Sequence, residues 1–309
     1  MTENGAEAEY HSKDFDFEEL SRDVHNDPSL RHHLLPFESS GEDVRVGGEE
    51  GSDAWRKFHA RHYSGKFFKE RRYLLKEFPE LAVPRDGGCK VLEVGCGNGS
   101  TVLPILRGNE NVTLYACDCS VEALDYAKQV VDGSEVASFR DRFYPFQCDF
   151  SHDGFPSWLS SKPCQETTLH TELVSANVYS NKTSCYVGGM DFVTLIFTLS
   201  AIPFKKMPMV LAECFSVLKA GGMLLFRDYG LYDMTMLRFK PDQRVGFQEY
   251  IRADGTRSYF FCLHTVRDLF LQAGFTELEL EYCCVKSINR RKEKIMRRVW
   301  VHGKFRKAE

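Results

Sequence analysis

The sequence predicts an α/β fold in which a mostly parallel β-sheet is covered by helices on both faces. Short apolar runs rich in β-branched residues alternate with segments of helical periodicity, as buried parallel strands and their crossover helices require. A glycine-rich turn directly follows the first of these runs. The last two runs alternate polar and apolar residues, which indicates an antiparallel pair of strands that closes the sheet.

The first half of this sheet is expected between residues 89 and 148. The expected strands are CKVLEV (89–94), VTLYAC (112–117) and FYPFQC (143–148). Residues 120–131 carry apolar side chains at helical spacing and begin with Ser120, a residue that caps helices well. They therefore predict a helix between the second and third strands.

The second half is expected between residues 192 and 305. The runs FVTLIFTL (192–199) and MLLFRDYG (223–230) are the expected strands, separated by a helix over 209–222 that ends at Gly221. A further helix is expected at 264–275, ending at Gly274. The closing antiparallel pair is expected at 277–283 and 297–305.

Three regions of the chain differ in composition. Residues 1–53 hold 15 Asp and Glu against 4 Lys and Arg, so they predict an acidic, mostly disordered leader, in which the apolar segment 30–37 is a candidate for docking onto the body. Residues 54–88 are basic and aromatic and predict a helical segment broken near Ser64 and Gly65. Residues 89–309 form the main domain, with a long polar insertion at 151–190.

Composition also excludes several classes of protein. No apolar run is long enough to span a membrane, and the acidic start fits neither a secretory signal nor an arginine-rich transit peptide. The 11 cysteines include no C-x-x-C pair, so we expect reduced thiols and no metal site. We expect a monomer in the cytoplasm, with the nucleus as an alternative location.

The turn after the first expected strand carries the clearest chemical signal. Its spacing places Glu93, Gly95, Gly97 and Gly99 at alternate positions, and glycines let the backbone approach a ligand where a Cβ would clash. A dinucleotide fingerprint, G-x-G-x-x-G, would need a glycine where Ser100 stands. The E-x-G-x-G-x-G spacing instead resembles motif I of class I methyltransferases.

Acidic residues follow the next two strands. Asp118 ends the second strand, where a carboxylate can accept hydrogen bonds from both hydroxyls of a ribose. Asp149 follows the third strand. Since ligands bind at the carboxyl ends of parallel strands, these residues and the glycine turn predict one nucleoside-cofactor site.

Further sequence blocks resemble the tRNA N3-methylcytidine methyltransferase family. They are FFKER (67–71), LIFTLSAI (195–202), FRDYGLYD (226–233), LRF (237–239) and DGTRSYFF (254–261), and they occur in that order. The resemblance extends from about Trp55 to Lys307. It implies a class I Rossmann-like fold, S-adenosyl-L-methionine as cofactor, and a cytidine in the tRNA anticodon loop, at position 32, as substrate.

The resemblance also implies which residues bind the cofactor. Carried over by position, with the glycine turn included, they are Trp55, His59, Glu93, Gly95, Gly97, Gly99, Asp118, Asp149, Phe150 and Ile196. In the family, the residue at Asp149 contacts the adenine amino group and the residue at Phe150 packs on the ring. His59 stands where relatives often carry Tyr, and Arg72-Tyr73 replaces a common His-Trp pair.

The reaction asks for little acid–base help, because N3 of neutral cytosine carries a lone pair and no proton. Methylation leaves a cationic base, so the enzyme must align N3 and tolerate the new charge. Asp228 is the candidate to contact the exocyclic amine or offset that charge, and Arg227 to bind a phosphate or the base carbonyl. Tyr229 or Tyr232 is the candidate to stack on the extruded base. Alternatively, Arg227 and Asp228 form a structural ion pair.

Two basic segments predict a surface that binds RNA backbone. Residues 55–76 hold eight Lys and Arg, and residues 286–307 hold ten against one acidic residue. The candidate RNA-binding residues are Lys69, Arg71, Arg72, Arg257, Arg290, Arg291 and Lys292. The expected partner is the anticodon stem-loop of tRNA, with an aminoacyl-tRNA synthetase or another tRNA-binding protein as a candidate presenter. Two alternatives stay open: methylation of a small molecule or protein, and a non-catalytic tRNA-binding subunit.

Overall fold

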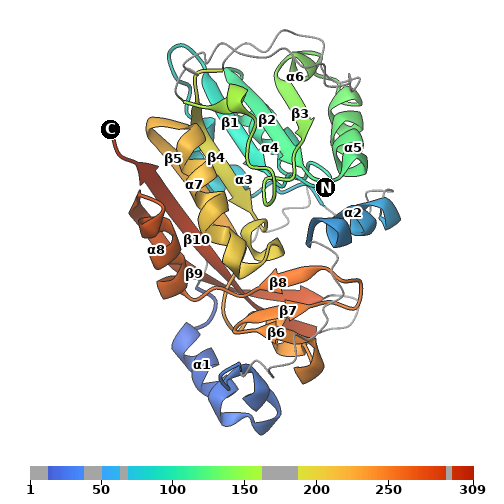
Figure 1. Cartoon of the computed structure of the whole chain (residues 1–309), viewed down its shortest axis with the longest axis vertical. Helices are drawn as coiled ribbons and strands as arrows, with labels where there is room; N and C mark the ends of the chain where they lie inside the picture. The colour runs from blue at the N-terminus through green and yellow to red at the C-terminus, as the bar shows by residue number, and fades with distance from the viewer. Residues whose placement is uncertain (1–12, 38–50, 63–68, 162–186, 290–293) are drawn as a thin grey trace, which may run out of the picture.

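A seven-stranded sheet forms the centre of the protein. The computed structural model describes residues 13–37, 51–62, 69–161, 187–289 and 294–309 (Figure 1). The strands are β1 (Cys89–Val94), β2 (Val112–Asp118), β3 (Phe143–Gln147), β4 (Met190–Ile196), β5 (Leu218–Tyr229), β9 (Phe275–Asn289) and β10 (Lys294–Lys307). Their order is β3-β2-β1-β4-β5-β10-β9. β1 to β5 are parallel and β10 runs antiparallel between β5 and β9, which confirms the predicted fold class.

Helices cover both faces of this sheet (Figure 1). On one side lie α3 (Leu74–Glu77), α4 (Val102–Gly108) and α5 (Val121–Asp132), and on the other α7 (Met207–Val217) and α8 (Leu263–Gln272). The short α6 (Ser138–Asp141) precedes β3. Short 3-10 turns occupy 28–33, 79–82, 157–159, 199–201, 204–206, 236–238 and 241–243.

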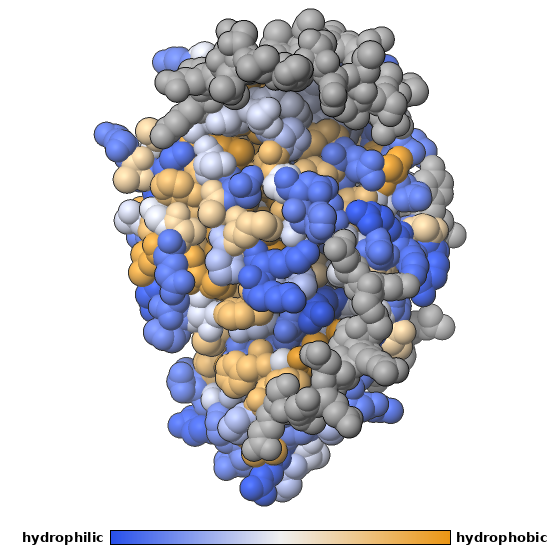
Figure 2. All heavy atoms as spheres, viewed as in Figure 1, coloured by the Kyte–Doolittle hydropathy of each residue, from blue (hydrophilic) through white to orange (hydrophobic). Residues whose placement is uncertain are grey.

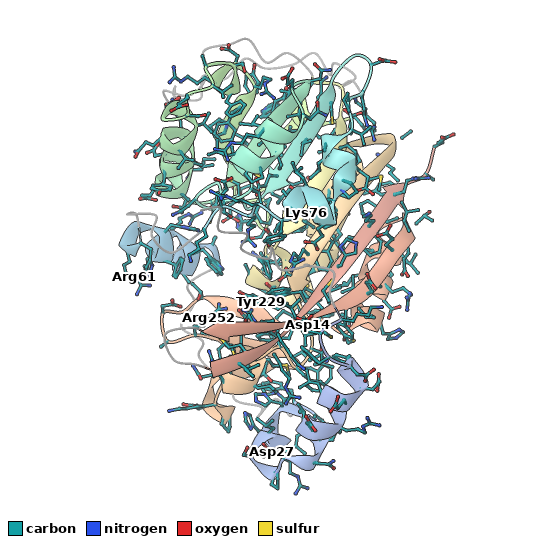
Figure 3. All side chains as sticks on the ribbon, turned by 180° about the vertical axis from the view of Figure 1, so that it is seen from behind. Asp14, Asp27, Arg61, Lys76, Tyr229 and Arg252 are labelled. Atoms are coloured by element: carbon teal, nitrogen blue, oxygen red, sulfur yellow. The ribbon has the colours of Figure 1, made fainter. Side chains whose placement is uncertain are left out.

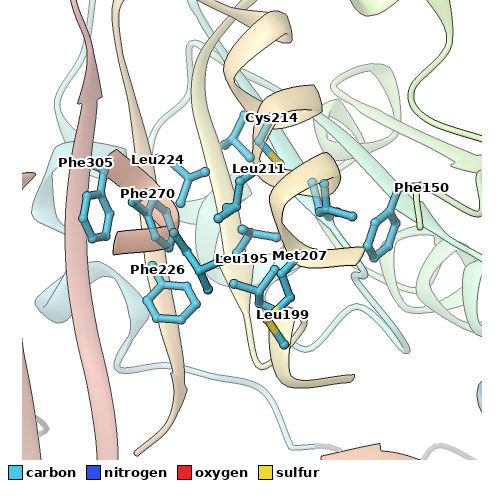
Figure 4. Close-up of a cluster of buried hydrophobic side chains, with 14 of the residues drawn as sticks. Phe150, Leu195, Leu199, Met207, Leu211, Cys214, Leu224, Phe226, Phe270 and Phe305 are labelled. Atoms are coloured by element: carbon cyan, nitrogen blue, oxygen red, sulfur yellow. The ribbon is translucent and has the colours of Figure 1, made fainter. Parts of the chain in front are cut away.

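The period of two along each strand divides the core into two clusters. On β4, Val193 and Leu195 pack toward α7 and α8, whereas Phe192 and Ile196 pack toward α3, α4 and α5. Figure 4 shows the first cluster, in which Phe226, Phe270 and Phe305 gather beside the side chains of α7. Burial on both faces explains why these strands are apolar throughout.

The expected boundary between 209–222 and 223–230 was wrong. α7 ends at Val217 and β5 begins at Leu218, so Gly221 lies inside the strand, where it has a φ of +73°. Gly222 follows it, and a Cβ there would approach the carbonyl oxygen of Lys219 to 2.9 Å. A glycine pair therefore marks an irregular strand start here, and not a helix end.

The expectation of a mostly disordered leader was also wrong for residues 13–37. Asp16 caps α1 (Phe17–Asn26), accepting a hydrogen bond from Glu19 N at 2.9 Å. Leu20 and Val24 are buried in a cluster with Tyr232. The main docking element is thus α1, which precedes the expected segment 30–37. Asp14 extends the contact, since its N–H donates to Cys284 O at 2.8 Å and its carboxylate accepts from Lys286 N at 2.7 Å.

A small antiparallel sheet, which the sequence pattern did not predict, follows β5. It contains β6 (Arg244–Gly246), β7 (Glu249–Ile251) and β8 (Arg257–Tyr259) in that order. Its strands are only three residues long, too short for a period of two to stand out. α2 (Gly51–Arg61) approaches the β7–β8 turn, where a Cβ on Gly255 would lie 3.5 Å from Ala54.

Further expectations from the sequence concern the cysteines, the insertion at 151–190 and membrane-spanning helices. The described cysteines are all free, and the described residues contain no cluster suited to a metal ion. Most of the insertion, and the break at Ser64 and Gly65, lie outside the described residues. No described helix is long and apolar enough to cross a membrane. On the face in Figure 2, hydrophobic residues lie in small groups between hydrophilic ones.

Candidate active site

A cavity of about 710 Å³ opens at the carboxyl ends of β1, β2, β4 and β5. The β7–β8 turn and α2 complete its walls. Figure 3 shows Tyr229 of β5 and Arg252 near the β7–β8 turn in the band between the two sheets. The cavity thus lies where ligands bind in open α/β sheets.

The glycine turn after β1 shapes the floor of this cavity. Gly95 and Gly97 both have positive φ, +68° and +51°, which favours glycine. A Cβ on Gly95 would fall 2.5 Å from Thr198 Cγ2, so that position has no room for a side chain. At Gly97 the nearest atom would be His59 Cε1 at 3.5 Å, and the N–H of Gly97 donates to Asp118 Oδ2 at 2.9 Å.

Two carboxylates reach the cavity from neighbouring strand ends. Asp118 is fixed by backbone donors, since Oδ1 also accepts from Ser120 N at 2.9 Å. Asp149 pairs with Arg56 of α2 at 3.1 Å. Each carboxylate oxygen can accept more than one hydrogen bond, so both residues keep acceptor capacity toward a ligand.

Apolar and aromatic side chains line the same half of the cavity. Phe150, Ile196 and Trp55 belong to this wall, and Trp55 Nε1 donates to Ala201 O at 3.2 Å. His59 Nδ1 lies 3.1 Å from Asn98 Oδ1. The glycine turn leaves room for a ligand beside the backbone, the two carboxylates can accept hydrogen bonds from ribose hydroxyls or an adenine amine, and the apolar faces can pack on the adenine ring, so these residues fit an adenosyl cofactor.

One of the expected cofactor residues, Gly99, lies outside the cavity, and another, Glu93, lines it as a buried side chain. Gly99 does not line the cavity, because a Cβ there would fall 2.8 Å from Ala127 Cβ of α5. Its role is close packing of the turn against a helix. Glu93 reaches the cavity wall, but it is buried and hydrogen-bonds with Thr101. Burial raises its pKa to about 7.

Known proteins resemble this chain over most of its length. A family model described as a methyltransferase domain matches residues 61–280. tRNA N(3)-cytidine methyltransferase METTL6 of Rattus norvegicus is 37% identical over 262 residues, which cover 84% of this chain and 80% of the rat protein. tRNA N(3)-methylcytidine methyltransferase Mettl2 of Drosophila melanogaster is 34% identical over 260 residues, covering 82% of this chain and 70% of the fly protein. The chain belongs to the tRNA N(3)-cytidine methyltransferase family.

The fold agrees with this family. A SAM-dependent methyltransferase of Anabaena variabilis superimposes with a TM-score of 0.53 at 13% identity, covering 84% of this chain and 96% of that one. The cofactor of such a methyltransferase is S-adenosyl-L-methionine, as predicted. The half of the cavity with Asp118 and Asp149 is the part that fits it.

Arg227, expected at the substrate, is instead fully buried behind the cavity. Its guanidinium pairs with Glu77 at the end of α3, and its Cζ lies 4.3 Å from the ring centroid of Trp300 and 4.8 Å from that of Tyr73. Its side chain is not part of the cavity wall. The alternative of an ion pair with Asp228 was wrong as to the partner, because Glu77 fills that place.

Asp228 and Tyr232 also lie outside the cavity wall. Asp228 is fully buried, and its carboxylate accepts from Ser200 N at 2.9 Å and from Tyr229 N at 2.8 Å. It therefore holds two residues that do line the cavity, while its own side chain is not part of the cavity wall. Tyr232 packs against Phe17 of α1, with ring centroids 6.0 Å apart, so of the two tyrosines expected to stack on the base, Tyr229 is the one that lines the cavity.

The second half of the cavity is lined by aromatic and basic side chains. Tyr73, Phe197, Tyr229 and Trp300 line it, and Arg71 Cζ lies 4.7 Å from the Phe197 ring centroid. Sequence reasoning missed Tyr73, Phe197 and Trp300 as site residues. Phe197 could have been found, because it stands inside the family block at 195–202.

The expected RNA-binding residues separate into three groups. Lys69, Arg71 and Arg257 line the cavity, and Arg257 pairs with Glu249 at 2.8 Å. Arg72 has an exposed side chain outside it and lies 3.8 Å from Glu70. Arg290, Arg291 and Lys292 lie outside the described residues.

Proposed function

We propose that this protein methylates N3 of a cytidine in the anticodon loop of tRNA, at position 32, using S-adenosyl-L-methionine. The observation that carries the proposal is the two-part cavity, in an enzyme of the tRNA N(3)-cytidine methyltransferase family. One part offers carboxylates and apolar walls for an adenosyl group, and the other offers aromatic faces and cations for a nucleotide. The family's relatives are named for action on tRNA cytidine.

The cofactor supplies an activated methyl group bound to a sulfonium. The protein's residues hold the nucleophile in place and keep water away. Arg61 of α2 donates to Asp254 O in the β7–β8 turn at 3.4 Å, so the helix and the small sheet meet beside the cavity. Tyr229, fixed through its N–H by Asp228, offers its ring to the base. Since N3 carries no proton, no general base is needed.

The experiment is methylation of unmodified tRNA by the purified protein, with 3-methylcytidine measured by mass spectrometry of digested RNA. Asp118→Ala serves as the cofactor-site variant. We expect product with the natural protein, a large loss with the variant, and no product on a tRNA whose cytidine 32 is replaced by uridine. Methylation of another nucleotide, or none on any tRNA from the source cells, contradicts the proposal.

A further inference from the structure

Arg298 of β10 lines the cavity beside Trp300, and a buried carboxylate fixes its orientation. Asp233 Oδ2 accepts from Arg298 Nε at 2.8 Å and from Val299 N at 2.9 Å. Its other oxygen accepts from Thr235 N at 2.8 Å. Asp233 is wholly buried, whereas the Arg298 side chain is 21% exposed. Asp233, in the segment after β5, thus holds Arg298 of β10 in a fixed orientation.

In the other arginines of the cavity, at least one terminal guanidinium nitrogen already has a partner. Arg71 donates to Ser100 Oγ at 3.0 Å and to the Tyr73 hydroxyl at 3.2 Å. Arg252 donates to Thr256 and to Arg257 O, and Arg257 pairs with Glu249. Among the described residues, the Nη atoms of Arg298 have no partner, because Asp233 engages only Nε. Arg298 is therefore the arginine with a terminal pair of donors available to a ligand.

We propose that Arg298 donates to the carbonyl oxygen of the target cytosine, and that Asp233 is its positioning residue. This proposal rests on the proposed function. Cytosine O2 is adjacent to N3, and it accepts hydrogen bonds before and after methylation. Arg298 and Trp300 line the same wall, with Arg298 Cζ 5.2 Å from the Trp300 ring centroid, so a base against Trp300 lies beside these donors.

The charge of Asp233 favours a base carbonyl over a phosphate. Methylation makes the base cationic, and an arginine without a counterion beside it would oppose that charge. Asp233 balances Arg298, which then donates hydrogen bonds without adding net charge to the site. A phosphate would gain more from an unbalanced cation, and the buried carboxylate would repel it.

The test compares Arg298→Ala, Asp233→Asn and the double variant Asp233→Asn/Arg298→Ala, with Arg306→Ala as a matched control on the exposed end of β10. Turnover on tRNA is measured at saturating cofactor, together with cofactor affinity and the salt dependence of tRNA affinity. We expect each single variant to lose about tenfold or more in kcat with unchanged cofactor affinity. We also expect Asp233→Asn to add little in the Arg298→Ala background, because it acts through Arg298.

Three results would overturn the proposal. If Arg298→Ala has the same kcat as the natural protein, Arg298 does not donate to the base. A lower salt slope with unchanged kcat shows a phosphate contact instead. Additive effects of the two substitutions show that Asp233 has only a structural role. If Arg298→Ala does not fold, Asp233→Asn/Arg298→Met leaves neither a buried charge nor a side-chain donor at position 298, and retained kcat in it contradicts the proposal. Lack of 3-methylcytidine with the natural protein would instead contradict the proposed function.

Discussion

Arg227 and Glu77 form an ion pair in which both side chains are closed off from solvent, 1% and 0% exposed. Burial opposes the ionisation of Glu77, but Arg227 and His302 outweigh it and hold the pKa of the carboxyl below its ordinary value. His302 Nδ1 lies 3.1 Å from the second carboxylate oxygen. The pair joins α3 to β5 and β10, directly behind the aromatic wall of the cavity.

Removing one partner of this pair should lower the free energy of unfolding. Glu77→Gln or Arg227→Met leaves a buried charge without its counterion, and we expect a loss of about 3–5 kcal/mol in the free energy of unfolding. Urea denaturation followed by circular dichroism measures it. The double variant Glu77→Leu/Arg227→Met should recover much of the loss, because no charge is then buried alone. Single variants as stable as the natural protein would contradict this account.

Asp118→Ala should weaken binding of S-adenosyl-L-methionine. The ribose hydroxyls lose a charged acceptor, which costs about 1.5–3 kcal/mol and corresponds to roughly ten- to hundredfold in Kd. Isothermal titration calorimetry measures the change. Asp86→Ala, an exposed carboxylate in the turn before β1, is the matched control and should bind normally. Equal affinity in both variants would mean that Asp118 does not bind the ribose.

Gly97 and Gly99 of the turn should respond differently to alanine. At Gly99 the new Cβ would overlap Ala127 at a φ of +74°, so Gly99→Ala should cost about 1–3 kcal/mol in stability. At Gly97 the φ of +51° also costs some stability, but the Cβ has room beside His59 and lies at the cavity wall, so Gly97→Ala should in addition weaken cofactor binding, and Gly97→Val more so. Thermal unfolding and calorimetry on both variants test this. If Gly97→Ala mainly lowers stability and Gly99→Ala mainly weakens cofactor binding, these assignments are wrong.

Asp228 should make stability depend on pH in an unusual direction. Burial raises its pKa from 3.8 to about 6, despite the backbone donors that favour the charged form. Between these values the folded protein keeps a proton that the unfolded chain has lost. The contribution is therefore fully present below pH 3.8 and is lost as pH rises to about 6, by up to about 3 kcal/mol.

The comparison with Asp228→Asn isolates this effect, because asparagine does not titrate. The stability difference between the natural protein and the variant should change between about pH 4 and about pH 7, in favour of the variant at the higher value. Urea unfolding at both values measures it. A difference that is the same at both would mean that Asp228 titrates normally.

That the glycine turn and the strand-end carboxylates lie together at one cavity could be predicted, because their signals are local in sequence. Gly95 and Gly97 directly follow a strand, and Asp118 ends the next one, so strand order alone brings them together. The strands of the core were found for the same reason, since burial on both faces makes each one a continuous apolar run. Their boundaries moved by a few residues where Gly221 and Gly222 start β5 irregularly.

The aromatic wall of the cavity could not be predicted in the same way. Tyr73, Phe197 and Trp300 come from separate parts of the chain and meet only through the antiparallel insertion of β10 beside β5. Arg227 and Asp228 are neighbours in sequence, yet the alternation of a strand sends one toward Glu77 and the other toward Ser200. A charged residue at a strand end looks the same in sequence whether it binds a ligand or supports the wall.

The contact of Asp14 with β9 covers part of an exposed edge of the large sheet. β9 is the last strand of the large sheet, and the outer edge of such a strand offers unpaired backbone groups to any other chain. Asp14 uses the Cys284 carbonyl and the Lys286 N–H on this edge, and α1 then covers the apolar surface around Tyr282 with acidic residues facing outward. We therefore expect residues 13–26 to limit association through this edge, so a variant that lacks them should aggregate more readily than the natural protein.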